Sequence, residues 1–306
     1  MKIFVTGASG HIGNLVTAEL LEAGHQVVGL SRSQAGADRL AAQGAEPVLG
    51  TMDETDRLAE LAAASDGVVN LAFSHDGGDF AAAIESDRAL IGAIGVALEG
   101  SGKPFLAASG TMILVGSTPA GEFGSEDTVV DVSRAANPRA VTEKLLLGLA
   151  DRGVRSGALR FSPTVHGPAD LHGFIPSLIA AARQRGSFGY VGDGENRWPA
   201  VHNIDTAHLI RLAIENEDLP AGIPLHAVAE EGIPFRRIAE AIGRRAGVPV
   251  ESVSPETAAE RYGFVGRFVG VDNPTSSAGT QELLGWSPTH PGLLEDLADG
   301  FYFARS

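Results

Sequence analysis

The segment TGASGHIG, residues 6–13, decides the fold of this chain of 306 residues. A short apolar run, Ile3 to Val5, stands directly before it, and apolar residues at helical spacing follow it. Glycine has no Cβ, so Gly7 permits a tight turn and Gly10 lets backbone N–H groups come close to a ligand. Gly13 lets the helix pack against the strand. The segment therefore predicts a strand, a tight turn and a helix whose first N–H groups face a pyrophosphate.

Short apolar runs alternate with helical patterns through the first 160 residues. The runs cover residues 3–5, 26–30, 45–49, 67–71, 104–107 and 156–161. This alternation is typical of βαβ units, which form a parallel sheet with helices on both faces. We therefore predict an α/β protein with a Rossmann-type doubly wound parallel sheet. Its ligand should bind beyond the carboxyl ends of the strands.

The second half of the chain has a different texture, because prolines and glycines interrupt the rhythm after Phe161. Helical patterns remain at residues 174–185, 204–215 and 235–243, apolar runs stand at 225–229 and 248–253, and two helices close the chain. We predict an NADP(H)-binding domain over residues 1–160. Residues 161–306 should form a smaller carboxyl-terminal α/β lobe that binds mainly substrate, with some segments returning to the first domain.

Composition excludes several classes of function. The chain has no cysteine, so disulfides, thiolate metal sites and cysteine nucleophiles are absent. The formal net charge of −15 and the lack of a basic cluster argue against a nucleic acid partner. The nine histidines show no metal-binding spacing, so we expect no metal. No apolar run reaches the ~20 residues that cross a bilayer, and no leader pattern is visible, so we expect a cytoplasmic protein and no membrane partner.

The glycine turn stands in the context that a dinucleotide site requires, with a strand before it, a helix after it and a second strand at the right distance. The residues predicted to hold the pyrophosphate are Gly7, Ser9, Gly10, His11, Ile12 and Gly13. An NAD-specific site would place Asp or Glu after the second strand, whereas this chain has Ser31, Arg32 and Ser33. Hydroxyls and a positive charge suit a 2′-phosphate, so we prefer NADP(H), with NAD(H) as the alternative. Arg32 could also be an ordinary surface arginine.

The chain resembles an extended short-chain dehydrogenase/reductase of the NAD-dependent epimerase/dehydratase type. The likeness rests on the glycine turn, on NLA at residues 70–72 and on RFSPTVHGP at 160–168. GDGENRWPAVH at 192–202 and LLGWSP at 283–288 add to it. The resemblance implies that Leu71, Ala72, Ser109, Pro163 and Val165 complete the cofactor site.

In this family, a Ser or Thr after the fifth strand and a Y-x-x-x-K helix carry the chemistry. The resemblance places Thr111 at the hydroxyl position, with Ser109 as a close competitor. It places Lys144 at the lysine, where it would also bind the ribose. Ala140 stands four residues before Lys144, where the family has tyrosine. A methyl group transfers no proton, so the chain resembles the atypical members that lack the tyrosine.

Another group or water would then transfer the proton. The candidates are His75, His166, Tyr190 and His202, because histidine titrates near neutral pH and a tyrosine can line a substrate pocket. His75 and His166 come first, since both follow strands at the edge where ligands bind.

The sequence thus predicts an NADP(H)-dependent oxidoreductase that acts on a small, mostly apolar carbonyl or alcohol. Loops 73–79, 113–134 and 171–194 would line its pocket. Two alternatives stay open: a nucleotide-sugar epimerase or dehydratase, and a non-catalytic sensor that binds a dinucleotide. Family members commonly pair through two long helices, here 80–98 and 140–150, so the resemblance also implies a homodimer.

Overall fold

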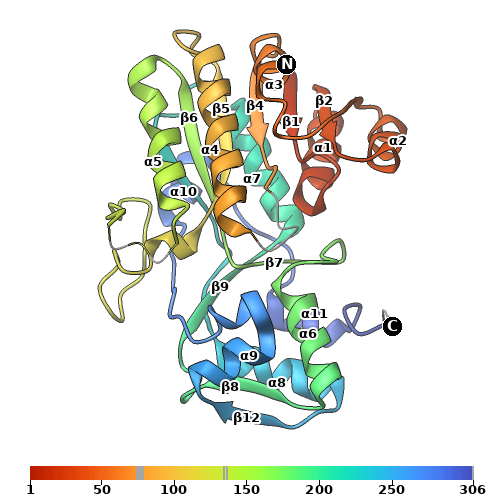
Figure 1. The fold of residues 1–306 in the computed structure, drawn as a ribbon, viewed down its shortest axis with the longest axis vertical. Coiled ribbons are helices and arrows are strands. Elements are labelled where there is room, and N and C mark those ends of the chain that lie inside the picture. Colours follow the sequence, from red (N-terminus) through yellow and green to blue (C-terminus); the bar gives the residue numbers. More distant parts are fainter. Residues whose placement is uncertain (74–78, 134, 136, 305–306) are drawn as a thin grey trace.

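The computed structural model describes residues 1–73, 79–133, 135 and 137–304. Seven parallel strands form the large sheet in the order β10-β6-β5-β4-β1-β2-β3. These strands are β1 Lys2–Thr6, β2 Gln26–Ser31, β3 Glu46–Leu49, β4 Gly67–Asn70, β5 Pro104–Gly110, β6 Arg155–Phe161 and β10 Ile223–Ala227. The predicted Rossmann-type parallel sheet is confirmed, and Figure 1 shows it in the upper half of the molecule.

Helices cover both faces of this sheet (Figure 1). The first face carries α1 His11–Glu22, α2 Gln34–Gln43 and α7 Asn203–Glu215, and the second carries α3 Thr55–Ala63, α4 Phe80–Ala97 and α5 Ala140–Gly148. Alternate residues of β1 divide between the two cores: Ile3 packs with Leu20 of α1, whereas Phe4 packs with Leu90 of α4. A strand that is apolar on both faces is what a helix-covered parallel sheet requires.

The smaller lobe has a hydrophobic core of its own. Two small sheets, β11-β9-β7 and β12-β8, pack with helices around Phe188, Trp198 and Phe235. The strands are β7 Thr164–His166, β8 Phe188–Val191, β9 Arg197–His202, β11 Glu230–Pro234 and β12 Val250–Val253. The helices of the carboxyl-terminal half besides α7 are α6 Phe174–Arg185, α8 Phe235–Ala246, α9 Pro255–Gly266, α10 Ala278–Leu284 and α11 Leu293–Asp299.

The chain returns from the second half to the large sheet. β10 pairs in parallel with β6, and α7 packs against α1, although both elements come after residue 160. Two short 3-10 helices, η1 Thr111–Leu114 and η2 Leu149–Arg152, follow β5 and α5. The expectation of two closing helices is wrong, because α9, α10 and α11 follow β12. In the described residues, no helix has the length and apolar character that a bilayer crossing needs.

Candidate functional site

The glycine turn forms a close-packed cradle at the carboxyl end of β1. The φ angle of Gly7 is +64°, and a Cβ there would lie 2.9 Å from the backbone nitrogen of Ala72. A Cβ on Gly13 would lie 2.1 Å from the carbonyl oxygen of Gly7. Leu71 borders the same turn, since its carbonyl carbon would also lie 2.9 Å from a Cβ on Gly7. No larger residue fits at positions 7 and 13 without a shift of the backbone.

The first turn of α1 suits an anion. Gly10 is the N-cap of this helix, and among the described residues no side chain caps its N–H groups. Its first turn also holds no acidic residue. Free N–H groups and the positive end of the helix dipole attract phosphate. The residues present therefore fit the pyrophosphate of a dinucleotide.

Ser31, Arg32 and Ser33 lie together at the end of β2, as the sequence suggested. The hydroxyl of Ser31 is buried, lies 3.0 Å from that of Ser9 and donates to the carbonyl oxygen of Ser33. The hydroxyl of Ser33 accepts from the N–H of Gly36 at 3.1 Å and so caps α2. Arg32 is exposed beside them. The two serine side chains thus have local structural bonds, and the side chain of Arg32 is exposed to solvent.

A first charged network joins the ends of β1, β4 and β5. The Asn70 amide accepts from the hydroxyl of Thr6 and donates to Asp87 Oδ1 at 3.4 Å. Arg139 Nη2 donates to Asp87 Oδ2 at 3.1 Å and to the carbonyl oxygen of Ala108 at 2.7 Å. Burial raises the pKa of Asp87, and Arg139 opposes that rise. The network fixes the guanidinium directly beside the last residues of β5.

Arg139 has one buried donor without a partner. Its Nε has no hydrogen bond among the described residues, and its guanidinium lies 4.2 Å above the ring of Phe73. An unsatisfied buried N–H costs about 1–3 kcal/mol, and more when the group is charged. This donor lies at the carboxyl edge of the sheet. A ligand oxygen that accepts its hydrogen bond would remove the cost of leaving it unsatisfied.

A second network begins one residue further along β5. Ser109 Oγ donates to Glu143 Oε2 at 2.6 Å, and the guanidinium of Arg160 binds Glu143 through both Nε and Nη2, at 2.6 Å for the shortest contact. All three side chains are buried. Arg160 Nη1 lies 3.1 Å from His226 Nε2 on the neighbouring strand β10.

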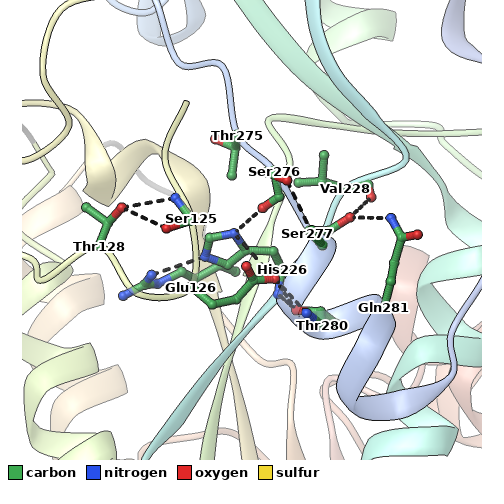
Figure 2. A network of polar contacts seen from close by, with 12 residues as sticks. Ser125, Glu126, Thr128, His226, Val228, Thr275, Ser276, Ser277, Thr280 and Gln281 are labelled. Atoms are coloured by element: carbon green, nitrogen blue, oxygen red, sulfur yellow. Dashed lines mark hydrogen bonds and ion pairs between the residues drawn. The ribbon is translucent and has the colours of Figure 1, made fainter. Parts of the chain in front are cut away.

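The contacts of His226 settle its protonation. Its Nδ1 lies 2.7 Å from the carbonyl oxygen of Ser276, which can only accept, so Nδ1 carries the proton. The guanidinium of Arg160 can only donate, so Nε2 accepts and the ring is neutral. Burial lowers the pKa of His226, in agreement with a neutral ring. Figure 2 shows this ring between Ser276 and Glu126, whose carboxylate also binds Thr280.

The comparisons with known proteins agree with this geometry. A family model described as NAD(P)H-binding matches residues 7–130. An uncharacterized protein of Schizosaccharomyces pombe is 47% identical over 303 residues, which cover 99% of this chain and 100% of that protein. The 2'-dehydrokanamycin reductase of Streptomyces kanamyceticus is 29% identical over 272 residues, covering 85% of this chain and 72% of that enzyme.

A similar solved structure is the UDP-glucose 4-epimerase of Thermus thermophilus in complex with NAD. Its TM-score is 0.76 at 19% identity, and the match covers 99% of this chain and 100% of that one. Residues 7–130 thus match an NAD(P)H-binding family, and the chain as a whole shares its fold with an NAD-bound nucleotide-sugar epimerase.

The chain differs from the expected arrangement at α5. Lys144, predicted to bind the ribose, is exposed, and its buried neighbour Glu143 bonds to Ser109 instead. Ala140 is buried, and Arg139 stands directly before it. Arg139 and Glu143 are four residues apart, and both bond to the end of β5. They occupy one face of the helix, because a spacing of four residues is close to one turn.

Thr111 and Ser109 also differ in their surroundings. The hydroxyl of Thr111 is buried and donates to Asn273 Oδ1 at 2.7 Å, and the Asn273 amide donates back to the carbonyl oxygen of Thr111. Ser109 instead bonds to a buried carboxylate. Of the two hydroxyls, that of Thr111 helps to hold η1 against the carboxyl-terminal half.

Two of the histidine candidates lie together in the smaller lobe. His166 is buried, its Nδ1 lies 2.6 Å from Asp296, and its ring packs edge-on against His202 at 5.5 Å. His202 caps α7 through Nδ1 and stacks on His290, and burial lowers its pKa. A hollow of about 400 Å³ borders His166 and His290. His75 lies outside the described residues.

The remaining predicted residues are placed as follows. The ring of Tyr190 is half-buried, with the guanidinium of Arg236 5.5 Å from its centroid. Pro163 and Val165 are half-buried on either side of the buried Thr164. Ile12 is half-buried in the first turn of α1. The described residues contain no group of three or more His, Cys, Asp or Glu side chains that could hold a metal ion.

His11 links the glycine turn to the carboxyl-terminal half. Its Nε2 lies 3.1 Å from the amide of Asn203, and its Nδ1 lies 3.8 Å from Asp170. Burial lowers the pKa of His11 to about 4, and burial raises the pKa of Asp170 to about 6. The Tyr302 hydroxyl donates to Asp170 at 2.9 Å. The sequence indicated only His11, because its partners come from distant segments.

Proposed function

We propose that this chain is an NADP(H)-dependent oxidoreductase that acts on a small, mostly apolar carbonyl or alcohol. The observation that carries the proposal is the uncapped amino terminus of α1 in a turn where a Cβ on Gly7 or Gly13 would collide with backbone. A nicotinamide dinucleotide supplies or accepts a hydride when it is bound. The similarity to a protein named as a reductase supports this class of reaction.

The preference for NADP(H) rests on Arg32 and the hydroxyls beside it. Arg32 is exposed at the end of β2, where a 2′-phosphate would lie, and neither Ser31 nor Ser33 is acidic. A guanidinium binds phosphate strongly, whereas a ribose 2′-OH would call for a carboxylate at this place. NAD(H) is the alternative cofactor.

We propose catalytic roles for a hydroxyl, for a histidine and for Lys144. Ser109 is better supported than Thr111 as the hydroxyl that orients substrate, because it lies at the carboxyl end of β5, where Glu143 and Arg160 hold it in place. For the proton, His75 and His166 stay the first candidates, because histidine titrates near neutral pH and both follow strands at the edge where ligands bind. Lys144 would have to turn inward from its exposed position to reach a ribose.

A titration with NADPH and NADH tests the proposal most directly. We expect NADPH to bind more tightly, and we expect Arg32→Ala to lose most of this preference while NADH binding stays the same. Arg39→Ala is the matched control, because Arg39 is also an exposed arginine and lies on α2. It should change neither the preference for NADPH nor the affinity for NADH. Lack of binding by both dinucleotides would sink the cofactor assignment and every catalytic role.

The similarity to an epimerase gives a second candidate, a nucleotide-sugar epimerase or dehydratase. At 19% identity this similarity speaks for the fold alone. Incubation with UDP-glucose and NAD separates the two, since an epimerase would interconvert the sugar without net consumption of the dinucleotide. A protein that binds dinucleotide yet turns over no substrate would favour the sensor.

We further propose a homodimer that pairs through α4 and α5. These helices pack on each other and present the exposed apolar side chains Val96, Val141 and Leu145. Exposed apolar side chains on adjacent helices favour association. Light scattering of Val141→Glu should show a smaller particle than the unmodified protein, and an unchanged mass would contradict this interface.

A further inference from the structure

A row of aromatic rings crosses from the large sheet to the smaller lobe. The row runs through Phe73, Phe80, Phe264, Phe268, Phe174 and Trp198, with successive ring centroids 5.2 to 5.9 Å apart. Its members come from the segment after β4, the start of α4, α9 and the segment after it, the start of α6, and β9, and Figure 1 shows α4 and α9 in different lobes. Residues so distant in sequence meet here only because the two lobes face each other.

The outer members of this row are not fully covered. Phe264 is 41% exposed, and Phe73, Phe80 and Phe174 are half-buried, whereas Trp198 is buried in the second core. Contiguous aromatic side chains that stay in contact with solvent commonly mark a binding surface. Flat rings stack on such a surface at centroid distances of about 4.5–7 Å.

Arg139 stands at the β5 end of the row. Its guanidinium covers Phe73, and its Nη2 is held by Asp87 and Ala108. Its Nε has no partner among the residues that the structure describes. The row therefore ends on a positioned cation with a spare hydrogen-bond donor, beside Ser109 at the edge where ligands bind in parallel sheets.

The charges around this donor point to a neutral ligand. Asp87 pairs with the half-buried Arg139, and Glu143 pairs with the buried Arg160, so both guanidinium groups already have a carboxylate. The ring of His226 is neutral, as its partners require. A carboxylate ligand would therefore bring an uncompensated negative charge, whereas a carbonyl oxygen would accept one hydrogen bond and add no charge.

We propose that this aromatic row and Arg139 form the substrate subsite, and that it takes neutral aromatic or conjugated ketones and aldehydes. The flat apolar part of the substrate stacks on the row, and its carbonyl oxygen accepts from the guanidinium. Arginine stays protonated in proteins, so Arg139 orients and polarises the oxygen and does not deliver a proton. This inference rests on the proposed function, because it names the substrate of the same site.

Binding of prodan, a fluorescent naphthyl ketone, tests the subsite without any turnover. We expect Phe264→Ala and Arg139→Gln each to weaken binding about tenfold, the loss of one stacking contact or one hydrogen bond. Two variants serve as matched controls. Phe303→Ala removes a half-buried ring beside Arg183, and Arg57→Gln removes an exposed arginine of α3, so both should bind like the unmodified protein.

The emission wavelength of bound prodan reports on the hydrogen bond to its carbonyl oxygen. Competition by a negatively charged ligand reports on the preference for a neutral one. Prodan bound to the unmodified protein should emit at longer wavelength than prodan bound to Arg139→Gln, because a hydrogen bond to its carbonyl stabilises the excited state. Naphthoate should compete poorly. Equal affinity for the ketone and the carboxylate would overturn the charge argument, and unchanged affinity in Phe264→Ala would overturn the aromatic subsite.

Titration with NADPH distinguishes failure of this inference from failure of the proposed function. All four variants should keep the NADPH affinity of the unmodified protein, which also shows that they are folded. If NADPH binds and prodan does not, the inference fails while the proposed function stands. If prodan binds as expected and no dinucleotide binds, the proposed function fails and the subsite stands.

Discussion

The glycine turn and the end of β5 lie at the same edge of the large sheet but are built in different ways. The turn consists of eight consecutive residues, 6–13, and acts through backbone groups. The end of β5 is surrounded by charged side chains from α4, α5 and β6, with the neutral ring of His226 from β10 beside them. The first region can be read from a short segment, whereas the second depends on how the strands are ordered in space.

The largest expected effect lies in the second region. Glu143→Gln would leave the buried Arg160 without its counterion, so it should lower the free energy of unfolding by about 3–5 kcal/mol. Denaturation in urea measures this. Glu85→Gln is the control, because Glu85 pairs with Arg88 at the surface and should contribute little. Equal, small losses in both variants would mean that the buried network adds no more than a surface pair.

The contact between the glycine turn and the carboxyl-terminal half should respond to pH. Burial raises the pKa of Asp170 from 3.8 to about 6, so the folded protein holds this proton more tightly than the unfolded chain. Stability linked to Asp170 therefore falls as pH rises from about 4 to about 6, by about 3 kcal/mol in total. His11, with its pKa lowered to about 4, gives the opposite slope and masks this loss in the unmodified protein.

Asp170→Asn removes the pH-dependent loss of stability that Asp170 causes. Comparison with the unmodified protein therefore separates the effect of Asp170 from that of His11. The difference in unfolding free energy between this variant and the unmodified protein should shift in favour of the variant by about 3 kcal/mol from about pH 4 to about pH 6. Thermal unfolding over this range measures it, with Asp193→Asn as the exposed control. A constant difference at every pH would show that Asp170 is ionised throughout.

A methyl group added at Gly13 tests the glycine turn. In Gly13→Ala the new Cβ meets the carbonyl oxygen of Gly7, so we expect a loss of about 1–3 kcal/mol in stability and weaker NADPH binding. Gly92→Ala in α4 is the control, since nothing lies within 4 Å of its added methyl. That variant should keep NADPH affinity and stability. If Gly13→Ala binds NADPH like the control, the cradle is not the dinucleotide site.

The smallest effect should come from the cap of α2. Ser33→Ala and Ser254→Ala each remove an N-cap hydroxyl, of α2 and α9, and should each cost about 1 kcal/mol. Only Ser33→Ala should also weaken NADPH binding, because Ser33 lies beside Arg32. If both variants bind NADPH like the unmodified protein, the role of Ser33 is to cap the helix and not to hold a 2′-phosphate.

Much of the fold could be predicted because its signals are local. The predicted apolar runs begin and end within one residue of β1 through β4 and β6, β5 continues three residues beyond its predicted end, and α6 begins and ends at the predicted residues. The missed strands, β7, β8, β9 and β11, are short or carry glycine and proline, so neither alternation nor length marks them. They exist because strands from separate parts of the chain pair with each other.

The sequence by itself determined the turn at Gly7, Gly10 and Gly13, because a positive φ angle and the free N–H groups of a helix start are local features of the chain. Tertiary structure alone decided which polar residues of α5 face inward. Arg139 and Glu143 turn toward β5 because Asp87 and Arg160 stand there to neutralise them, while Lys144, one residue on, is exposed. A buried charge is stable only beside its partner, and that partner lies 52 residues away for Arg139 and 17 for Glu143.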